Sequence, residues 1–224
     1  MERAYRNIGY FLLVLPPIFV AGFWIPYFSE MPNFDPSITA AVHLHALLLF
    51  AWIVLLVVQP LAIRFGAYDL HRDLGRMSYV VMPLIAVSAV AMIYKEYHEH
   101  VTGGMRASSA LAAELLSACQ LLLLVAFYCS AIMSIKRRDV AAHMRYMICI
   151  ALVLLPAGLA RTLGYWFDLS QSSSQTCSLA FIDLSLAGLI WFDRTRHLTA
   201  RPYIRALMAY VVIEAGWVAL GRPI

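Results

Sequence analysis

The stretch ITAAVHLHALLLFAWIVLLVVQPLAI, residues 38–63, decides the fold class of this chain. It contains no Asp, Glu, Lys or Arg and exceeds the ~20 apolar residues that one helix needs to cross a bilayer. Six further segments share its apolar character, at 8–28, 76–95, 107–135, 141–165, 176–192 and 203–220. Because backbone groups in lipid must bond within their own segment, the pattern predicts an all-α bundle of seven transmembrane helices in one domain, residues 1–224.

The composition excludes a water-soluble enzyme. Hydrophobic residues make up 62% of the 224 residues and charged residues 13%, whereas soluble domains are about half apolar and roughly a quarter charged. At roughly 30 residues for a span and its connection, seven spans use the whole length and leave no room for a soluble domain. The net charge of +4 comes from basic residues dispersed between apolar runs, which indicates topology signals and not nucleic-acid binding.

The basic residues also predict how the bundle is oriented. Lys95, Arg106, Arg161 and Arg222 fall on one side of the predicted membrane. The other thirteen fall on the opposite side, at the N-terminus and in alternate connections: Arg3, Arg6, Arg64, Arg72, Arg76, Lys136, Arg137, Arg138, Arg145, Arg194, Arg196, Arg201 and Arg205. Because positive charge accumulates on the cytoplasmic side, we expect an inner-membrane protein with a cytoplasmic N-terminus and an external C-terminus.

Turn-forming residues separate the segments, at 31–33, 66–69, 102–104 and 170–175. Prolines at 16–17, 60, 83 and 156 fall inside apolar segments, where we expect kinks. His98, His100 and His197 are expected in loops, where Glu96 and Glu99 could bind a metal ion weakly beside the first two. The four cysteines lie inside apolar runs without a CxxC spacing, which is typical of buried structural thiols.

Ionisable side chains within apolar segments form the first candidate site, because each unpaired carboxylate there costs ~2.5–3.5 kcal/mol. At ~1.5 Å rise per residue these groups lie roughly 8–11 Å below the external boundary. They are His43, His45, Glu114, Asp183 and the supporting Glu214, with Arg161 slightly higher. Such a cluster could be a metal site, a proton relay or a substrate pocket. The sequence favours this external cluster over a second candidate site, which is described below.

Two features leave the external cluster open to another interpretation. The two histidines are two residues apart, hence about 200° apart on a helix, so at most one points inward. The carboxylates could also be buried structural partners, for example Arg161 with Glu114 or Asp183.

A second candidate site lies at the cytoplasmic ends of two segments. LHRDLGR, residues 70–76, opens the third segment, and DVAAHMR, residues 139–145, opens the fifth. Histidines at one level on two helices of a bundle can be the axial ligands of a b-type haem, so His71 and His143 are candidate cofactor ligands. The nearby Arg72, Arg76 and Arg145 would then suit the haem propionates. The alternative is that these His and Arg residues anchor the helix ends to lipid phosphates.

The ordered motifs H-x-H (43–45), L-H-R-x-L-G (70–75) and A-H-x-R-x-M (142–147) resemble those of uncharacterised bacterial multispan membrane-protein families. The resemblance covers about residues 40–205 and implies an inner-membrane location. The histidine after the Thr-Arg segment usually precedes proline in those families, whereas Leu198 follows His197 here. A weaker analogy links the chain to transmembrane cytochrome b proteins of the ascorbate-reducible type, which pair histidines between helices. The fourth segment has no histidine to pair with the second, so this analogy implies at most one haem.

Three classes of function remain open from the sequence. The first is a cofactor-binding redox or electron-transfer protein that holds b-type haem or a transition-metal ion such as zinc, iron or copper. The second is a metal-dependent hydrolase of a lipid or small amphiphile, with His43 or His45 and Asp183 or Glu114 as ligands. The third is a transporter or accessory subunit that contacts membrane lipid and other membrane-protein subunits.

Overall fold

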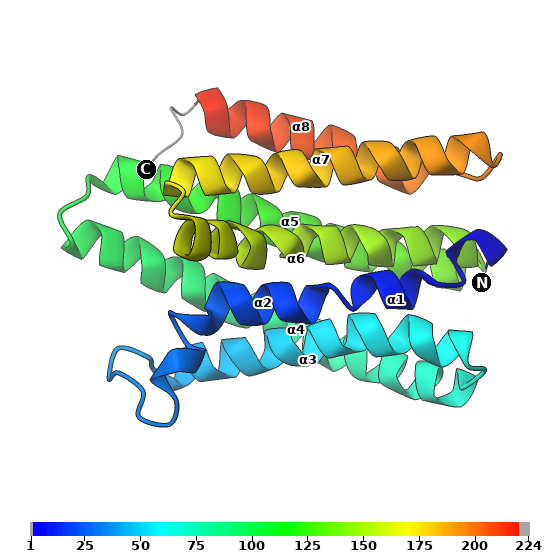
Figure 1. The fold of residues 1–224 in the computed structure, drawn as a ribbon, viewed down its shortest axis with the longest axis horizontal. Coiled ribbons are helices and arrows are strands. Elements are labelled where there is room, and N and C mark those ends of the chain that lie inside the picture. Colours follow the sequence, from blue (N-terminus) through cyan, green and yellow to red (C-terminus); the bar gives the residue numbers. More distant parts are fainter. Residues whose placement is uncertain (1, 220–224) are drawn as a thin grey trace.

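The computed structural model describes residues 2–219, apart from the side chain of residue 112. This part contains eight α-helices and two short 3-10 helices, joined by turns and loops. No strand occurs in this part, which confirms the all-α prediction. The N-terminal segment comprises η1 (Arg3–Tyr5), α1 (Ile8–Leu12), α2 (Leu15–Trp24) and η2 (Phe28–Glu30). The long helices then run up and down the bundle (Figure 1): α3 (Ala40–Arg64), α4 (Tyr68–Thr102), α5 (Ala107–Lys136), α6 (Val140–Phe167), α7 (Gln171–Thr195) and α8 (Arg201–Ala219).

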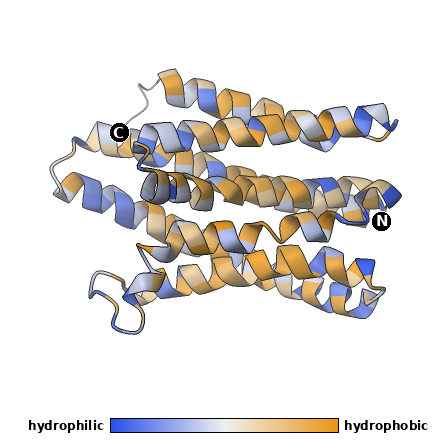
Figure 2. Cartoon of the chain, viewed as in Figure 1, coloured by the Kyte–Doolittle hydropathy of each residue, from blue (hydrophilic) through white to orange (hydrophobic). Residues whose placement is uncertain are grey.

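Six of these segments are long and apolar enough to cross a membrane: 3–24, 40–64, 68–102, 107–136, 140–167 and 171–195. Figure 2 shows the apolar residues in the middle of the bundle and the polar ones toward its two ends. The chain therefore has the architecture of a multi-pass membrane protein. Helix α8 carries Arg201, Arg205 and Glu214 and does not meet the same criterion. The seventh crossing predicted over 203–220, of which residue 220 lies outside the described part, stays a prediction.

Proline shapes the first segment more strongly than the later ones. The apolar run 8–28 is broken, because α1 ends at Leu12 and α2 begins at Leu15 with Pro16 and Pro17 in its first turn. Proline lacks an N–H and collides with the preceding turn, so it favours the first turn of a helix. Pro60, Pro83 and Pro156 lie inside helices that continue through them.

Two helices extend well beyond their predicted apolar segments, which corrects two loop predictions. Helix α4 has 35 residues, or ~52 Å, whereas the hydrocarbon core is ~30 Å thick. His98 and His100 therefore lie in its last turns and not in a loop. Residues 171–175 also begin a helix, since the Ser170 hydroxyl accepts the N–H of Ser173 at 3.2 Å and caps α7. The ends of these two helices consist largely of polar residues, so hydropathy does not reveal that the helix continues there.

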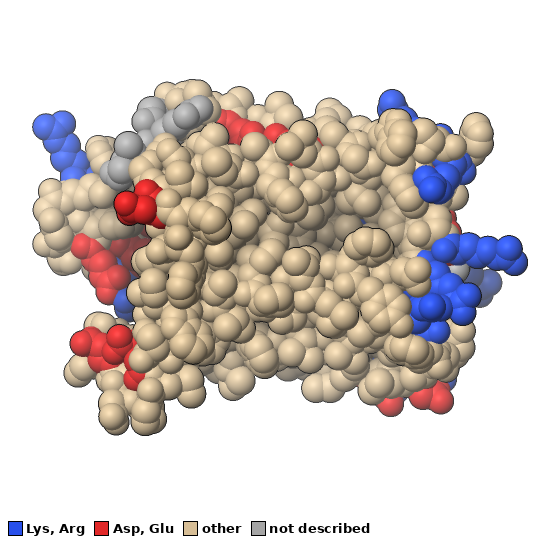
Figure 3. Space-filling view, in the orientation of Figure 1, with Lys and Arg blue, Asp and Glu red and all other residues tan. Residues whose placement is uncertain are grey.

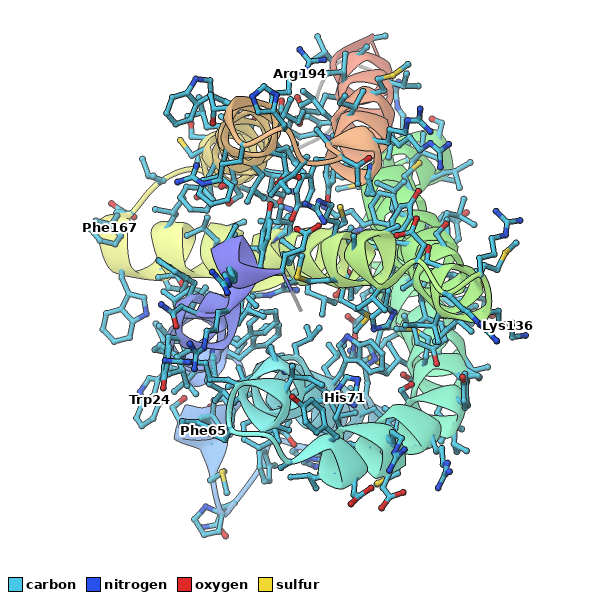
Figure 4. The ribbon with its side chains drawn as sticks, turned by 90° about the vertical axis from the view of Figure 1, so that its right-hand side faces the viewer. Trp24, Phe65, His71, Lys136, Phe167 and Arg194 are labelled. Atoms are coloured by element: carbon cyan, nitrogen blue, oxygen red, sulfur yellow. The ribbon has the colours of Figure 1, made fainter. Side chains whose placement is uncertain are left out.

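Helix α6 is the centre of the bundle. Half of the residues in its most apolar stretch are buried inside the protein, whereas at most 28% are buried in the corresponding stretches of the other candidate spans. It packs against α2, α3, α5, α7 and α8. The end-on view shows α6 crossing between α3 and α4 on one side and α7 and α8 on the other (Figure 4). The first residues of α6 therefore face several neighbouring helices at once.

Lysine and arginine gather at one end of the molecule, on the right in Figure 3. We call this the basic end; it carries the start of the N-terminal segment and the α3–α4, α5–α6 and α7–α8 connections. Helices α4 and α6 both begin there, with Tyr68 and Val140. Their first turns thus lie at the same level of the bundle.

Candidate functional site

The two histidines of the H-x-H motif face different neighbours. The His43 Nδ1 atom lies 2.7 Å from the Tyr27 hydroxyl, and its ring contacts Phe34 edge-on at 4.6 Å between centroids. The His45 Nδ1 atom lies 2.9 Å from the Ser88 hydroxyl of α4. This divergence is what a spacing of two residues on a helix produces.

The carboxylates predicted for the external site also find separate partners. Glu114 is buried, with its Oε1 atom 3.3 Å from Nδ1 of His100 at the end of α4. Asp183 of α7 lies beside Glu214 of α8, so these two members of the predicted site are neighbours.

Arg161 forms no ion pair with either of the carboxylates suggested for it, although it lies close enough to Glu114 and His45 to interact with them electrostatically. It lies 3.9 Å from the Glu96 carboxylate and stacks over the Phe23 ring at 4.8 Å. Within residues 2–219, no three His, Cys, Asp or Glu side chains come together in a group that could hold a metal ion. Among the described residues, the residues predicted for the external site therefore do not form a metal-binding group of three, and the external site stays a prediction.

The histidines of the second candidate site do share one space. A cavity of about 810 Å³ lies between α1, α3, α4, α5 and α6, and both His71 and His143 line it. The two imidazoles are close enough to interact electrostatically. In Figure 4 His71 faces the open centre of the basic end, below α6. Most of the wall is apolar, including Leu12, Trp52, Leu56, Ile132, Met147 and Ile148.

His143 is held in a defined orientation. Its Nδ1 atom lies 3.0 Å from the carbonyl oxygen of Ala131 in α5. A carbonyl only accepts, so Nδ1 carries the proton, and a neutral ring leaves the lone pair of Nε2 free. Histidines that bind metal commonly donate their second ring N–H to a carbonyl in this way. The geometry is therefore that of a ligand oriented by its neighbour.

His71 is contacted by Gln59 of α3. In the orientation that gives both amide atoms a partner, the Gln59 oxygen accepts the Gly75 N–H at 2.9 Å and its nitrogen donates to Nδ1 of His71. The proton of the neutral His71 ring then lies on Nε2. If the amide turns over, its oxygen accepts from Nδ1–H instead and leaves Nε2 as a lone pair. Turning the amide over also brings its NH2 group to the Gly75 N–H, a second donor, so a free lone pair on His71 Nε2 requires Gln59 to give up that hydrogen bond.

The cavity wall includes a buried donor without a partner. Trp52 is 1% exposed, and its indole N–H has no hydrogen-bond partner among the described residues. Its ring packs edge-on against Tyr128, at 5.7 Å between centroids, and the Tyr128 hydroxyl lies 2.9 Å from that of Ser78. An unsatisfied buried donor costs ~1–3 kcal/mol, which an acceptor on a bound molecule would remove.

The three arginines predicted beside these histidines have different environments. Arg72 and Arg76 line the cavity and form exposed ion pairs with Asp69 and Asp73, so they can still turn toward a ligand. Arg145 is fully buried and is used otherwise. Its Nε and Nη2 atoms bind the Asp193 carboxylate at 2.7 and 3.1 Å, and Nη2 also binds Glu2 at 2.8 Å.

This buried ion pair belongs to a network that reaches the N-terminal segment. Tyr5 donates to the Asp193 Oδ1 atom at 2.7 Å, and the Arg145 guanidinium stacks over its ring at 5.0 Å. The network fastens the start of the chain to α6 and α7, which positions α1 as a wall of the cavity.

No pattern in the sequence predicts a role for Asp193, Gln59 or Trp52. Gln59 was the best available signal, since it is an amide within an otherwise apolar run.

Comparison with family models, with curated proteins and with solved structures found no match for this chain. The functional assignment therefore rests on the residues of this chain.

Proposed function

We propose that the cavity holds one b-type haem, with His71 and His143 as axial ligands, and that the protein transfers electrons. The observation that carries this proposal is that two histidines, from α4 and α6, line one largely apolar cavity. Cofactor sites of helix bundles are built from such inward-facing side chains. A cavity of about 810 Å³ also falls within the ~300–1,000 Å³ typical of cofactor pockets.

The number of donors favours haem over a bare metal ion. Zinc in proteins takes three or four protein ligands, whereas haem iron needs only one or two from the protein. The cavity offers two histidines, and its one lining carboxylate, Glu2, is already bound to Arg145. The same count argues against the metal-dependent hydrolase considered from the sequence.

The other residues of the cavity suit the periphery of a haem. Arg72 and Arg76 can exchange their exposed partners for propionates, because arginine binds carboxylates through two parallel hydrogen bonds. The Trp52 N–H would gain an acceptor on the bound group. When bound, haem supplies one-electron chemistry; the apolar wall excludes water, and the Ala131 carbonyl keeps His143 oriented.

We further propose that the basic end faces the cytoplasm of a bacterial cell and that α8 crosses the inner membrane as a seventh span. The excess of Lys and Arg at that end supports this orientation. A periplasm-active reporter fused after Ile224 is expected to be active. Activity only of a cytoplasmic reporter there would contradict the topology.

The haem proposal predicts a visible spectrum that depends on two histidines. Purified protein incubated with haemin is expected to show a Soret band with about one haem per chain, and His71→Ala or His143→Ala should remove most of it, because each variant loses an axial ligand. His45→Ala is the matched control, since His45 lies in α3 and bonds Ser88 away from the cavity. Absence of haem from the wild type, or an equal loss in the control, would contradict the proposal.

A further inference from the structure

A second pocket at the basic end has a different chemical character. It encloses about 540 Å³ between α5, α6 and α8 and shares no lining residue with the haem cavity. Three arginines line it: Arg137 at the end of α5, and Arg201 and Arg205 in the first turns of α8. Asp139 is its one acidic lining residue.

None of these three arginines forms an ion pair within residues 2–219. The Asp139 carboxylate is engaged locally, because it accepts the N–H of Ala142 at 2.9 Å as the cap of α6. Arg205 donates to the Tyr146 hydroxyl at 2.9 Å, which directs its guanidinium along the pocket wall. Three arginines against one carboxylate leave the pocket with an excess of positive charge, and within residues 2–219 none of the three is held in an ion pair.

The remaining lining residues leave these charges available. The hydroxyls of Ser130 and Ser134 donate to backbone carbonyls of α5, each at 2.8 Å, and do not compete for the guanidinium groups. Met133 and Pro202 supply an apolar part of the wall. An occupant that matches this surface has an anionic group for the arginines and an apolar part beside it.

We propose that this pocket binds the phosphate group of an anionic phospholipid. Guanidinium groups bind phosphate oxygens through paired hydrogen bonds, and basic pockets between helices at the cytoplasmic side suit anionic headgroups. A headgroup seated here can leave its acyl chains on the neighbouring apolar surface, where Met133 of α5 is 49% exposed and Met208 of α8 is 65% exposed. A free phosphate ion would use the same arginines but not this surface.

The test is native mass spectrometry of the detergent-solubilised full chain, titrated with dioleoyl phosphatidylglycerol, dioleoyl phosphatidylcholine or inorganic phosphate. Phosphatidylglycerol is expected to bind the wild type more tightly than the other two. Arg137→Gln, Arg201→Gln and Arg205→Gln should each weaken it roughly fivefold, because each removes one guanidinium group that binds the phosphate within the pocket. Arg194→Gln is the matched control at the same end but outside the pocket, and it should change little.

Three results would overturn the proposal. Equal binding of phosphatidylglycerol and phosphatidylcholine would show that charge does not select the occupant. Full displacement of phosphatidylglycerol by inorganic phosphate at similar concentration would assign the pocket to a free anion. An equal loss in Arg194→Gln and the three pocket variants would reduce the effect to general surface charge.

Discussion

Asp193→Ala is expected to lower the free energy of unfolding by about 3–5 kcal/mol, because it leaves a buried guanidinium without its main partner. Arg145 and Asp193 are both 0% exposed, and two hydrogen bonds join them. Loss of the Asp193 carboxylate also leaves the Tyr5 hydroxyl without its acceptor. The measurement is reversible unfolding in mixed micelles, by titration with sodium dodecyl sulphate and helix content as the signal.

Asp73→Ala is the matched control for this prediction. Asp73 accepts from Arg76 at 3.0 Å, and both side chains are about 70% exposed, so the loss should be about 0–1 kcal/mol. Equal effects of the two substitutions would show that the buried pair adds nothing beyond an exposed one.

Gly22→Ala is expected to cost about 1–3 kcal/mol, because the site has no room for a side chain. A Cβ atom at position 22 would overlap the carbonyl oxygen of Gly158 in α6 and lie 3.0 Å from its Cα atom. The same helix contact is held by Thr162, which donates to the Ile18 carbonyl at 3.2 Å, and by Trp166, which donates to that of Ala21 at 3.0 Å. Small residues permit this approach of two helices in a membrane.

The same titration measures this loss, with Gly188→Ala as control. A Cβ atom at position 188 in α7 meets nothing within 4 Å, so alanine there should change the free energy of unfolding by about 1 kcal/mol or less. An unchanged stability of Gly22→Ala would mean that α2 does not pack closely on α6.

Hydropathy predicted the helices because crossing a bilayer requires an uninterrupted apolar run. It did not predict the full lengths of α4 and α7, whose ends are polar and continue beyond the apolar segment. Residue counting also placed His43, His45, Glu114 and Asp183 at one depth. Depth does not fix rotation about the helix axis, and these side chains face different neighbours.

That His71 and His143 line one cavity could be predicted, because both histidines lie near the starts of helices that begin at the same end of the bundle. The bond between Arg145 and Asp193 could not, since the residues are 48 positions apart and helix spacing does not choose partners across a bundle. Arg145 was therefore predicted beside the cofactor, whereas the structure uses it to fasten the N-terminal segment.

Electron paramagnetic resonance of haemin-reconstituted protein tests the central claim most directly, because it reports the axial ligands of the iron. Two histidine ligands predict a low-spin ferric signal in the wild type and in His45→Ala. Any haem that remains bound in His71→Ala or in His143→Ala should give a high-spin signal, because one axial ligand is lost. A high-spin wild type, or a low-spin signal that survives both substitutions, would contradict haem ligation by His71 and His143.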